Sequence, residues 1–451
     1  MKKTIISLVA IILVLSLAAG ILLWPEREIV PEIRPLAGKA TVLAQALYPV
    51  AAAYPDESRY QTDQQGWKED FEAWRKANRE RDDLATRAAD TDAFLVKTMG
   101  EFLTGTENRV YSPLNIYFAL AMLAETTDGN SRQQILDLLG SSNVEQLRQQ
   151  ANALWQAHYR DDGVVTSRLA GSLWLNQQVP VNQQPLDILA QQYYASSYSG
   201  EPGTQEFDRA LQEWINTQTG GLLADSVKDI QIDGETVLAL ATTIYYRARW
   251  DGRFLESNTT PDTFYSPQGE VTCDFMHATR RGSYYWGQQF GAIELTLQEG
   301  GGMWLFLPDE GKTTQDLLAD PQVHQLLWGR EYADCKELLI NLSLPKFDVS
   351  AQTTLNDGLK NLGVTDIFSP ATGNFSPLGT QLPLAVSQAL HQARVQIDEE
   401  GCTATAVTVI QEAGSSMPPK DEVDFDLDRP FLFAITSEYG APLFVGTVQN
   451  P

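Results

Sequence analysis

The feature that most constrains this chain is a strand-forming run beside an exposed loop, within residues 397–430 (IDEEGCTATAVTVIQEAGSSMPPKDEVDFDLDRP). Apolar Val395 and Ile397 alternate with polar residues, which predicts a strand that should end at Gly401. Residues 403–410 (TATAVTVI) nevertheless favour another strand, because they are β-prone and contain neither charge nor proline. Residues 412–422 are small, polar and broken by proline, which indicates an exposed loop. An unpaired strand beside such a loop invites aggregation, so we expect it to serve a function.

Composition indicates a globular protein with a large core. The chain has 451 residues, of which 43% are hydrophobic and 20% are charged. Its formal net charge of -25 repels phosphate backbones and argues against a nucleic-acid partner. The acidic residues are dispersed along the chain, as expected of a soluble surface.

The first 24 residues have the pattern of an export segment. Lys2 and Lys3 precede an unbroken apolar run over residues 4–24, and a bilayer-spanning helix needs about 20 such residues. Cleavage within residues 17–20 (LAAG) would leave an apolar start to the mature chain, so an uncleaved signal anchor is favoured over a cleaved signal peptide. In both cases the rest of the chain is expected outside the cytoplasm, either membrane-anchored or secreted.

Residues 25–90 are expected to form an extracytoplasmic linker and N-terminal extension. Their first part is charged and broken by prolines, which is typical of a tether. Trp67, Phe71 and Trp74 then recur at helical spacing amid dense charge, which predicts an amphipathic helix over residues 67–84. We expect its aromatic stripe to pack onto the main domain.

Residues 91–451 predict one domain of the α+β class, because helices come mainly first and strands mainly later. Ser112 and Pro113 have the order of a helix cap and first turn. Strands are expected over residues 237–250, 303–311 and 337–351, with a final hairpin turning at Tyr439. The glycines at 300–302 indicate another hairpin turn.

The patterns of catalytic and metal sites are missing from the sequence. No serine lies in a GxSxG motif, and HExxH, CxxC and GxGxxG do not occur. The histidines show no context that marks a general base: His158, His277, His324 and His391. The odd set of Cys273, Cys335 and Cys402 does not suggest a disulfide framework. We therefore expect a protein that is not an enzyme and needs neither cofactor nor metal.

Six segments follow one another in the chain: VYSPLNIYFALAMLAETTDGNSRQQILDLLG, WINTQTGGLLADSV, IYYRARWDGRF, LSLPKFDVSAQTTLNDGLKNLGVTDIFSP, ALHQARVQIDEEG and DRPFLFAITSEYGAPLFVGTVQNP. Together, and in this order, they resemble the serpins, the serine protease inhibitor family. The resemblance covers nearly four-fifths of the chain and suggests a bacterial-type secreted or membrane-anchored member. It implies a large central β-sheet A, two further sheets, a helical cluster and an exposed reactive-centre loop at about residues 399–424.

The resemblance also gives the β-prone run a role. In serpins a protease cuts the reactive-centre loop, whose first part then inserts into the central sheet and carries the acylated protease with it. The implied hinge comprises Glu399, Glu400, Gly401, Cys402, Thr403, Ala404, Thr405 and Ala406. In an inserted strand alternate side chains face the core, here Cys402, Ala404, Ala406, Thr408 and Ile410, and all are uncharged.

Two positions remain open for the reactive bond. Counting from Glu399 gives Ser415–Ser416, and counting back from the DRPF motif gives Ser416–Met417. Either choice places a small residue before the cut, which favours an elastase-like or subtilisin-like serine protease over a trypsin-like one.

The resemblance further implies a sheet-opening region. Ser112, Asn115 and His391 are expected to share hydrogen bonds beneath the moving strands, and Trp250 to lie under the insertion point. Thr242 and Leu222 depart from the Asn and Lys common in the family, and Cys402 replaces a Thr or Ser. The expected function is covalent trapping of a serine protease. The protein is expected to act as a monomer. The alternative is a non-inhibitory serpin that acts as a binding or chaperone module.

Overall fold

The structure is a computed structural model that describes residues 40–55, 60, 62–86, 91–224, 227–328, 332–379, 383–402 and 421–451. The chain divides into two units, Met1–Pro35 and Leu36–Pro451, and all described residues belong to the second. The predicted anchor at residues 1–24 therefore lies outside the described residues. Among the helices that are described, none has both the length and the apolar character of a membrane span.

The described helices precede most of the long strands. The helices are α2 (Gln64–Ala85), α3 (Asp92–Phe102), α4 (Pro113–Thr126), α5 (Gly129–Leu139), α6 (Val144–His158), α7 (Gln183–Gln192), α8 (Gln205–Gln218), α9 (Thr314–Leu318), α10 (Pro321–Leu327) and α11 (Asn356–Asn361). The strands are β1 (Thr41–Ala44), β2 (Arg109–Tyr111), β3 (Arg160–Asp161), β4 (Thr166–Asn176), β5 (Ala195–Gly200), β6 (Leu238–Arg249), β7 (Thr259–Ser266), β8 (Gly269–Trp286), β9 (Phe290–Thr296), β10 (Gly302–Pro308), β11 (Cys335–Pro345), β12 (Phe347–Thr354), β13 (Val386–Ile397), β14 (Gly401–Cys402), β15 (Glu422–Asp426), β16 (Phe431–Thr436) and β17 (Pro442–Val448).

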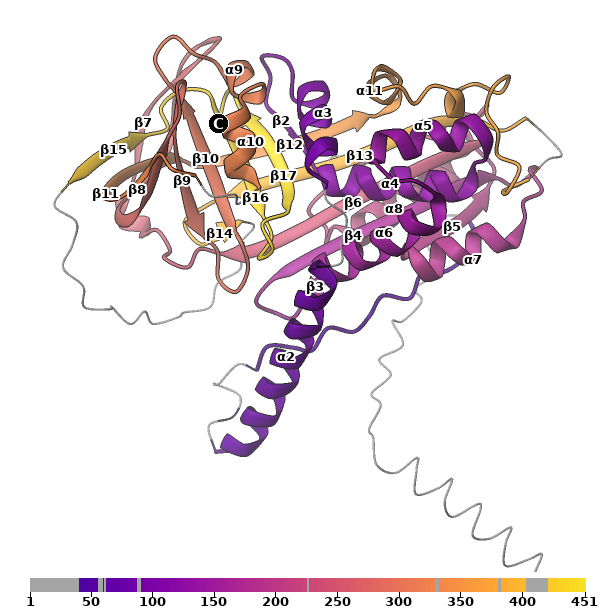
Figure 1. The fold of residues 1–451 in the computed structure, drawn as a ribbon, viewed down its shortest axis with the longest axis horizontal. Coiled ribbons are helices and arrows are strands. Elements are labelled where there is room, and N and C mark those ends of the chain that lie inside the picture. Colours follow the sequence, from indigo (N-terminus) through magenta and orange to yellow (C-terminus); the bar gives the residue numbers. More distant parts are fainter. Residues whose placement is uncertain are drawn as a thin grey trace, which may run out of the picture. The chain divides into compact units, whose positions relative to one another are not determined.

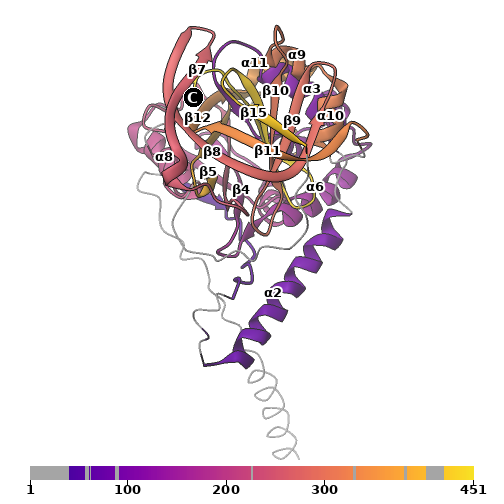
Figure 2. The ribbon, with the colours of Figure 1, turned by 90° about the vertical axis from the view of Figure 1, so that its left-hand side faces the viewer.

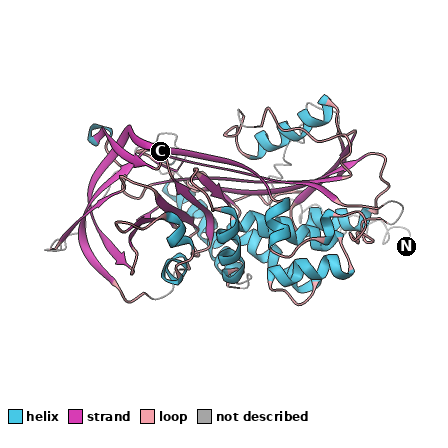
Figure 3. Cartoon of the chain, turned by 90° about the horizontal axis from the view of Figure 1, so that it is seen from above, coloured by secondary structure: helices cyan, strands magenta, loops and turns pink. Residues whose placement is uncertain are grey.

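A long sheet, here called sheet A, forms the centre of the described fold (Figure 1). Its strand order is β1-β5-β4-β6-β14-β13-β12, and β3 pairs with β4. Helices lie on both faces, most of them on one (Figure 3). Successive residues of β6 point to opposite faces. Leu240 therefore joins the large core with α4, whereas Ala239 and Ala241 pack in a smaller cluster with α8.

The remaining strands form a second sheet in the order β15-β11-β8-β9-β10-β16-β17-β2, with β7 paired to β8. The family resemblance implies two further sheets, but in the described residues they are continuous. The reason is the length of β8, which pairs at its start with β7, along most of its course with β11, and at its end with β9. One strand thus belongs to both halves of this layer (Figure 2).

Several local predictions are confirmed. The Ser112 side chain caps α4 by accepting a hydrogen bond from the Asn115 backbone N–H, with Pro113 in the first turn. The predicted long strand is β6, and the final hairpin is β16–β17. The predicted amphipathic helix is α2, in which Trp74 is buried.

Part of the segment expected to be a linker belongs to sheet A. Strand β1 pairs antiparallel with β5, so it extends the sheet by one strand. The short run TVLA contains β-branched residues and lies beside a strand edge that needs a partner. The sequence analysis predicted no strand here, because four residues are too few to show a clear alternation of apolar and polar side chains.

Candidate functional site: the hinge and the β6–β13 seam

The β6–β13 seam, meaning the line along which these two strands adjoin, is closed over only part of its length. The strands pair in parallel from Val386–Leu238 to Gln392–Thr243. Beyond that point β13 continues to pair with β12, as far as Ile397 with Phe347. Strand β6 likewise continues to pair with β4, as far as Arg247 with Thr166. The two strands therefore diverge towards the end that carries the hinge.

The hinge enters the seam at its open end. Gly401 and Cys402 form β14, which pairs antiparallel with Arg249 and Ala248 of β6. Cys402 also pairs with Ile397 on β13, so β14 lies between the two diverging strands. The first inserting residue predicted from the sequence is thus already seated in sheet A.

Gly401 is the residue that this entry requires. Its φ is 152°, a value that side chains with a Cβ rarely adopt. A Cβ at this position would lie 2.4 Å from the Ala248 carbonyl oxygen and 2.7 Å from the Arg249 Cα. Both are backbone atoms of β6, so neither can move aside alone. Glycine therefore allows the hinge to approach the sheet closely.

Trp250 is 1% exposed and contacts the chain at this entry. Its indole Nε1–H donates to the Asp398 carbonyl oxygen at 2.9 Å, and its backbone N–H donates to the Glu400 carbonyl oxygen at 3.1 Å. The Asp398 carboxylate in turn accepts from the backbone N–H groups of Glu400 and Gly401 at 2.9 and 3.2 Å. These contacts fix the direction in which the chain leaves β13.

The two acidic hinge residues have cationic partners. Lys346 approaches the Glu399 carboxylate to 2.9 Å, and the Thr259 hydroxyl donates to it at 2.8 Å. Burial would raise the pKa of Glu399, but these hydrogen bonds outweigh it and hold the pKa below the usual value. Arg253 approaches Glu400 at 3.5 Å. Sequence analysis missed Lys346 and Arg253, since no spacing connects them with residues that lie more than fifty positions away.

Cys402 is a buried free thiol. It is 2% exposed and belongs to the large core, and burial raises its pKa well above the ordinary value. All three cysteines lie in described parts of the chain and are free thiols, with Cys335 exposed and Cys273 partly exposed. A thiol reagent can therefore reach Cys402 only when the hinge leaves the sheet.

Three residues of the sheet-opening region, Ser112, Asn115 and His391, lie at the closed part of the seam, whereas Trp250 lies at its open end. His391 is fully buried, and its Nε2 accepts a hydrogen bond from the Ser112 backbone N–H at 3.0 Å. Nε2 therefore carries no proton in this arrangement, and burial lowers the pKa of His391 to about 4. Across the seam, His391 is the register partner of Thr242.

Asn115 takes part differently from the prediction. Its backbone N–H donates to the Ser112 hydroxyl, but its side-chain amide nitrogen is buried without a hydrogen-bond partner among the described residues. The Thr242 hydroxyl and His391 Nδ1 are likewise buried without such partners there. With Thr242 in place of the family's Asn, the network between strands is smaller than the resemblance implied.

The other predicted site residues cannot be placed. Thr403, Ala404, Thr405 and Ala406 of the hinge lie outside the described residues. The same holds for the candidate reactive-bond residues Ser415, Ser416 and Met417.

Comparison with known proteins identifies the family. The family model described as Serpin (serine protease inhibitor) matches residues 91–451. The chain belongs to the serpin family. It is 28% identical over 364 residues to Serpin-Z1C of Triticum aestivum, covering 77% of this chain and 91% of that protein. It is also 28% identical over 359 residues to alpha-1-antiproteinase 2 of Equus caballus, covering 77% and 82%.

Solved structures agree on the fold. The crystal structure of human glycosylated kallistatin superposes with a TM-score of 0.71 at 22% identity, covering 82% of this chain and 99% of that one. The serpin fold, with mixed α and β content, is therefore established for this chain. Serpins in general are protease inhibitors rather than enzymes.

Proposed function

We propose that this serpin is a suicide inhibitor of an elastase-like or subtilisin-like serine protease. The observation that carries the proposal is β14, which occupies the open end of the β6–β13 seam and pairs with both strands. The chain that follows is the uncharged run 403–410, which can continue the same strand. Cleavage of the loop would free this run to complete sheet A.

The register of β14 supports an expectation for where each inserted residue would go. Since Cys402 lies opposite Ala248, continued antiparallel pairing would bring Ala404 opposite Tyr246, Ala406 opposite Ile244 and Thr408 opposite Thr242. Tyr246 and Ile244 belong to the large core. Opposed residues in a sheet share a face, so Ala404 and Ala406 would enter that core, where small uncharged side chains are needed.

The same register explains why β6 and β13 must separate along the closed part of the seam during full insertion. Thr408 would stand between Thr242 and His391, which are partners in the described state. Full insertion therefore separates β6 from β13 at the buried His391. The contact of His391 with Ser112 would then resist premature opening.

The trapping chemistry uses the protease's own serine. Its oxygen forms an ester with the carbonyl carbon of Ser415 as the Ser415–Ser416 bond breaks, and the proton passes to the new amine of Ser416. Insertion of residues 403–410 then moves the ester-linked protease before water can hydrolyse the ester. With Ser416–Met417 as the reactive bond, the chemistry is the same. The small residue before either bond suits the shallow pocket of an elastase-like or subtilisin-like protease.

We also propose that the inhibitor acts outside the cytoplasm as a monomer, secreted or held at a membrane by residues 1–24. The support is the cationic start and apolar run of that segment. The alternative function, a non-inhibitory binding module, is disfavoured by the small residues Ala404 and Ala406, which leave the inserting face unobstructed.

Incubation with a panel of serine proteases tests the proposed function. We expect an elastase-like or subtilisin-like enzyme to give a complex that survives boiling in detergent, with mass spectrometry placing the cut between Ala413 and Met417. Clean cleavage of the loop by every protease, without a covalent complex, would favour the non-inhibitory alternative.

A further inference from the structure

The N-terminal extension, residues 40–86, packs against a buried charge cluster on the serpin domain. Helix α2 lies before the segment that matches the family model. Its Trp74 is 5% exposed, and the indole Nε1–H donates to the Asp162 carboxylate at 2.9 Å. The Tyr54 backbone N–H donates to the Asp162 carbonyl oxygen at 2.8 Å. The extension therefore covers the turn that precedes β4.

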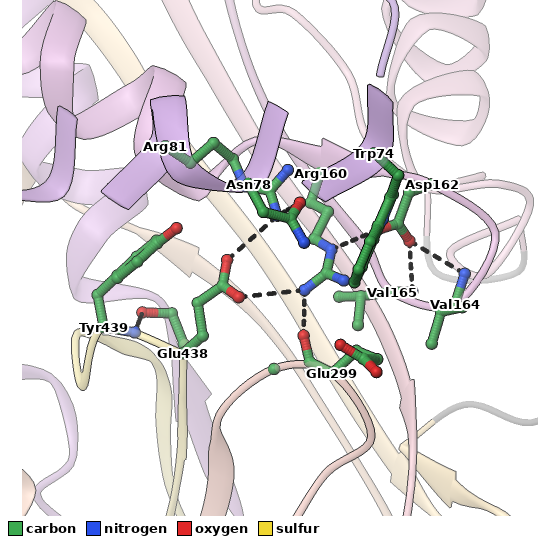
Figure 4. A network of polar contacts seen from close by, with 12 residues as sticks. Trp74, Asn78, Arg81, Arg160, Asp162, Val164, Val165, Glu299, Glu438 and Tyr439 are labelled. Carbon is green, nitrogen blue, oxygen red and sulfur yellow. Dashed lines mark hydrogen bonds and ion pairs between the residues drawn. The ribbon is translucent and has the colours of Figure 1, made fainter. Parts of the chain in front are cut away.

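Arg160 is the centre of this cluster (Figure 4). Its side chain is 4% exposed, pairs with Asp162 at 2.6 Å, and lies with its guanidinium carbon 5.8 Å from the Trp74 ring centroid. Burial alone would raise the pKa of Asp162, but Arg160 and Trp74 hold it below the usual value. Trp74 satisfies one oxygen of Asp162 in this buried pair, whereas Arg160 Nη2 is buried without a hydrogen-bond partner among the described residues.

The cluster also joins α2 to the turn between β16 and β17. Glu438, in this turn, pairs with Arg160 at 3.4 Å and with Arg81 of α2 at 3.3 Å. The Arg81 side chain is only 11% exposed, and it also donates to Asn78. Arg81, which precedes the segment matched by the family model, and Arg160, which lies within it, thus share the Glu438 carboxylate.

A third contact reaches the turn between β9 and β10. Arg160 donates to the carbonyl oxygen of Glu299. Glu299 has a φ of 52°, a left-handed conformation that costs a non-glycine residue free energy and needs support from its surroundings. Arg160 supplies such support from beneath the extension.

The same turn is bonded to the end of β6 on which the hinge is seated. The Tyr246 hydroxyl donates to the Gly300 carbonyl oxygen at 3.0 Å, and the Gln298 backbone N–H donates to the Arg249 carbonyl oxygen at 2.8 Å. Arg249 is the β6 partner of Gly401. A contiguous set of contacts therefore runs from α2 to the hinge.

We propose that the N-terminal extension controls the hinge: α2, through Arg160 and the β9–β10 turn, holds the end of β6 in the position that seats Gly401 and Cys402. The proposal goes beyond inhibition itself, and it concerns the state of the uncut protein. When α2 contacts are lost, water enters around Arg160, the strained Glu299 loses support, and β6 is freer to move. The seated hinge then leaves the sheet more often.

Cys402 is a native reporter of this equilibrium, because it is buried when β14 is seated. In the full chain with Cys273→Ser and Cys335→Ser, a maleimide reagent can react only at Cys402. Reaction requires local opening of the hinge, so its rate follows the population of the unseated state. The measurement uses no protease, so it is independent of whether inhibition occurs.

Two variants weaken the proposed link from opposite sides. Trp74→Phe keeps an aromatic ring on α2 but removes the hydrogen bond to Asp162. Glu438→Gln leaves α2 intact and removes the carboxylate shared by Arg81 and Arg160. Arg79→Ala is the matched control, because Arg79 is an exposed cation on the same helix. Coupling between sites typically corresponds to about 5–150-fold, so we expect at least about fivefold faster labelling in both network variants.

The global free energy of unfolding is measured for each variant in urea. Faster labelling in both network variants, beyond any change in global unfolding, supports the proposal. Rates equal to that of Arg79→Ala would overturn it. An acceleration fully matched by the loss of global stability would also overturn it, since the effect would then not be local to the hinge. If Trp74→Phe does not fold, Glu438→Gln decides.

Discussion

The two parts of the β6–β13 seam differ in what joins the strands. Over residues 386–392 the strands pair directly, and neutral, buried His391 contacts Ser112 beneath them. Over residues 393–397, β13 still pairs with β12 on its outer side, and among the described residues only β14 lies between it and β6. The closed part is therefore a finished sheet, whereas the open part accepts a strand from the same chain.

The two parts also differ in electrostatics. The closed part is held by hydrogen bonds and apolar packing, with His391 0% exposed. The open end is rimmed by the ion pairs Lys346–Glu399 and Arg253–Glu400, whose side chains are partly exposed. Solvent screening weakens exposed pairs, so the hinge is the part of the seam that can move first.

The largest expected effect comes from a charge on the inserting face. Ala404→Arg would place an unpaired guanidinium opposite Tyr246 in the large core, at a cost of several kcal/mol. Insertion slows, and the protease hydrolyses the ester and leaves. Each 1.4 kcal/mol changes a rate or equilibrium constant by about tenfold. We therefore expect the stoichiometry of inhibition, meaning the moles of inhibitor consumed for each mole of protease inactivated, to rise by about tenfold or more.

Thr405→Arg is the matched control for that variant. On insertion, continuation of the β14 register would bring residue 405 opposite Tyr245, which is partly exposed, so the added charge would stay near solvent. We expect continued inhibition with little change in stoichiometry. Equal damage from the two substitutions, measured by titration against the same protease, would refute the assignment of alternate faces.

Much of this site could be predicted because its signals are local. The long strand-forming run at residues 237–250 predicted β6, the Ser112–Pro113 pair predicted the start of α4, and glycine at 401 marked a change of direction. Contacts between distant residues carry no such signal. Arg160 and Glu438 are 278 positions apart, and sequence offered no reason to pair them. The helix stripe predicted that Trp74 is buried, but not that it covers a charge.

An intermediate effect is expected from Gly401→Ala. The added Cβ meets the Ala248 carbonyl oxygen, and the residue must keep a positive φ, at a cost of about 1–3 kcal/mol. This substitution acts on the open part of the seam and leaves the closed part intact. We expect Cys402 to react faster with maleimide by roughly 5–150-fold. Unchanged labelling would mean that the hinge does not need the close approach at Gly401.

The smallest expected effect is a pH dependence of the closed part. Burial lowers the pKa of His391 to about 4, while the unfolded chain has an ordinary histidine pKa of about 6.5. Between these values the unfolded state binds more protons, so acidification from about pH 6.5 towards pH 4 destabilises the folded protein. Protonation at Nε2 would also break the hydrogen bond from Ser112.

Thermal midpoints at about pH 7 and about pH 4.5 check this dependence. The wild-type midpoint should fall with acidification, and His391→Gln should remove part of the fall. His158 also has its pKa lowered to about 4 by burial, so His158→Gln measures the share that arises away from the seam. If His391→Gln loses as much stability on acidification as the wild type, His391 is not the neutral group that the structure indicates.

Hydrogen exchange of the cut and uncut protein tests the central claim most directly, which is that residues 403–410 are a strand held in reserve. After a protease cuts between Ala413 and Met417, those residues should fill the open part of the seam. We predict that those amides in residues 244–247 and 393–396 that face the open seam become strongly protected on cleavage, while amides in 238–243 and 386–392, where β6 and β13 already pair, change much less. Unchanged exchange in the open part after cleavage would contradict the account.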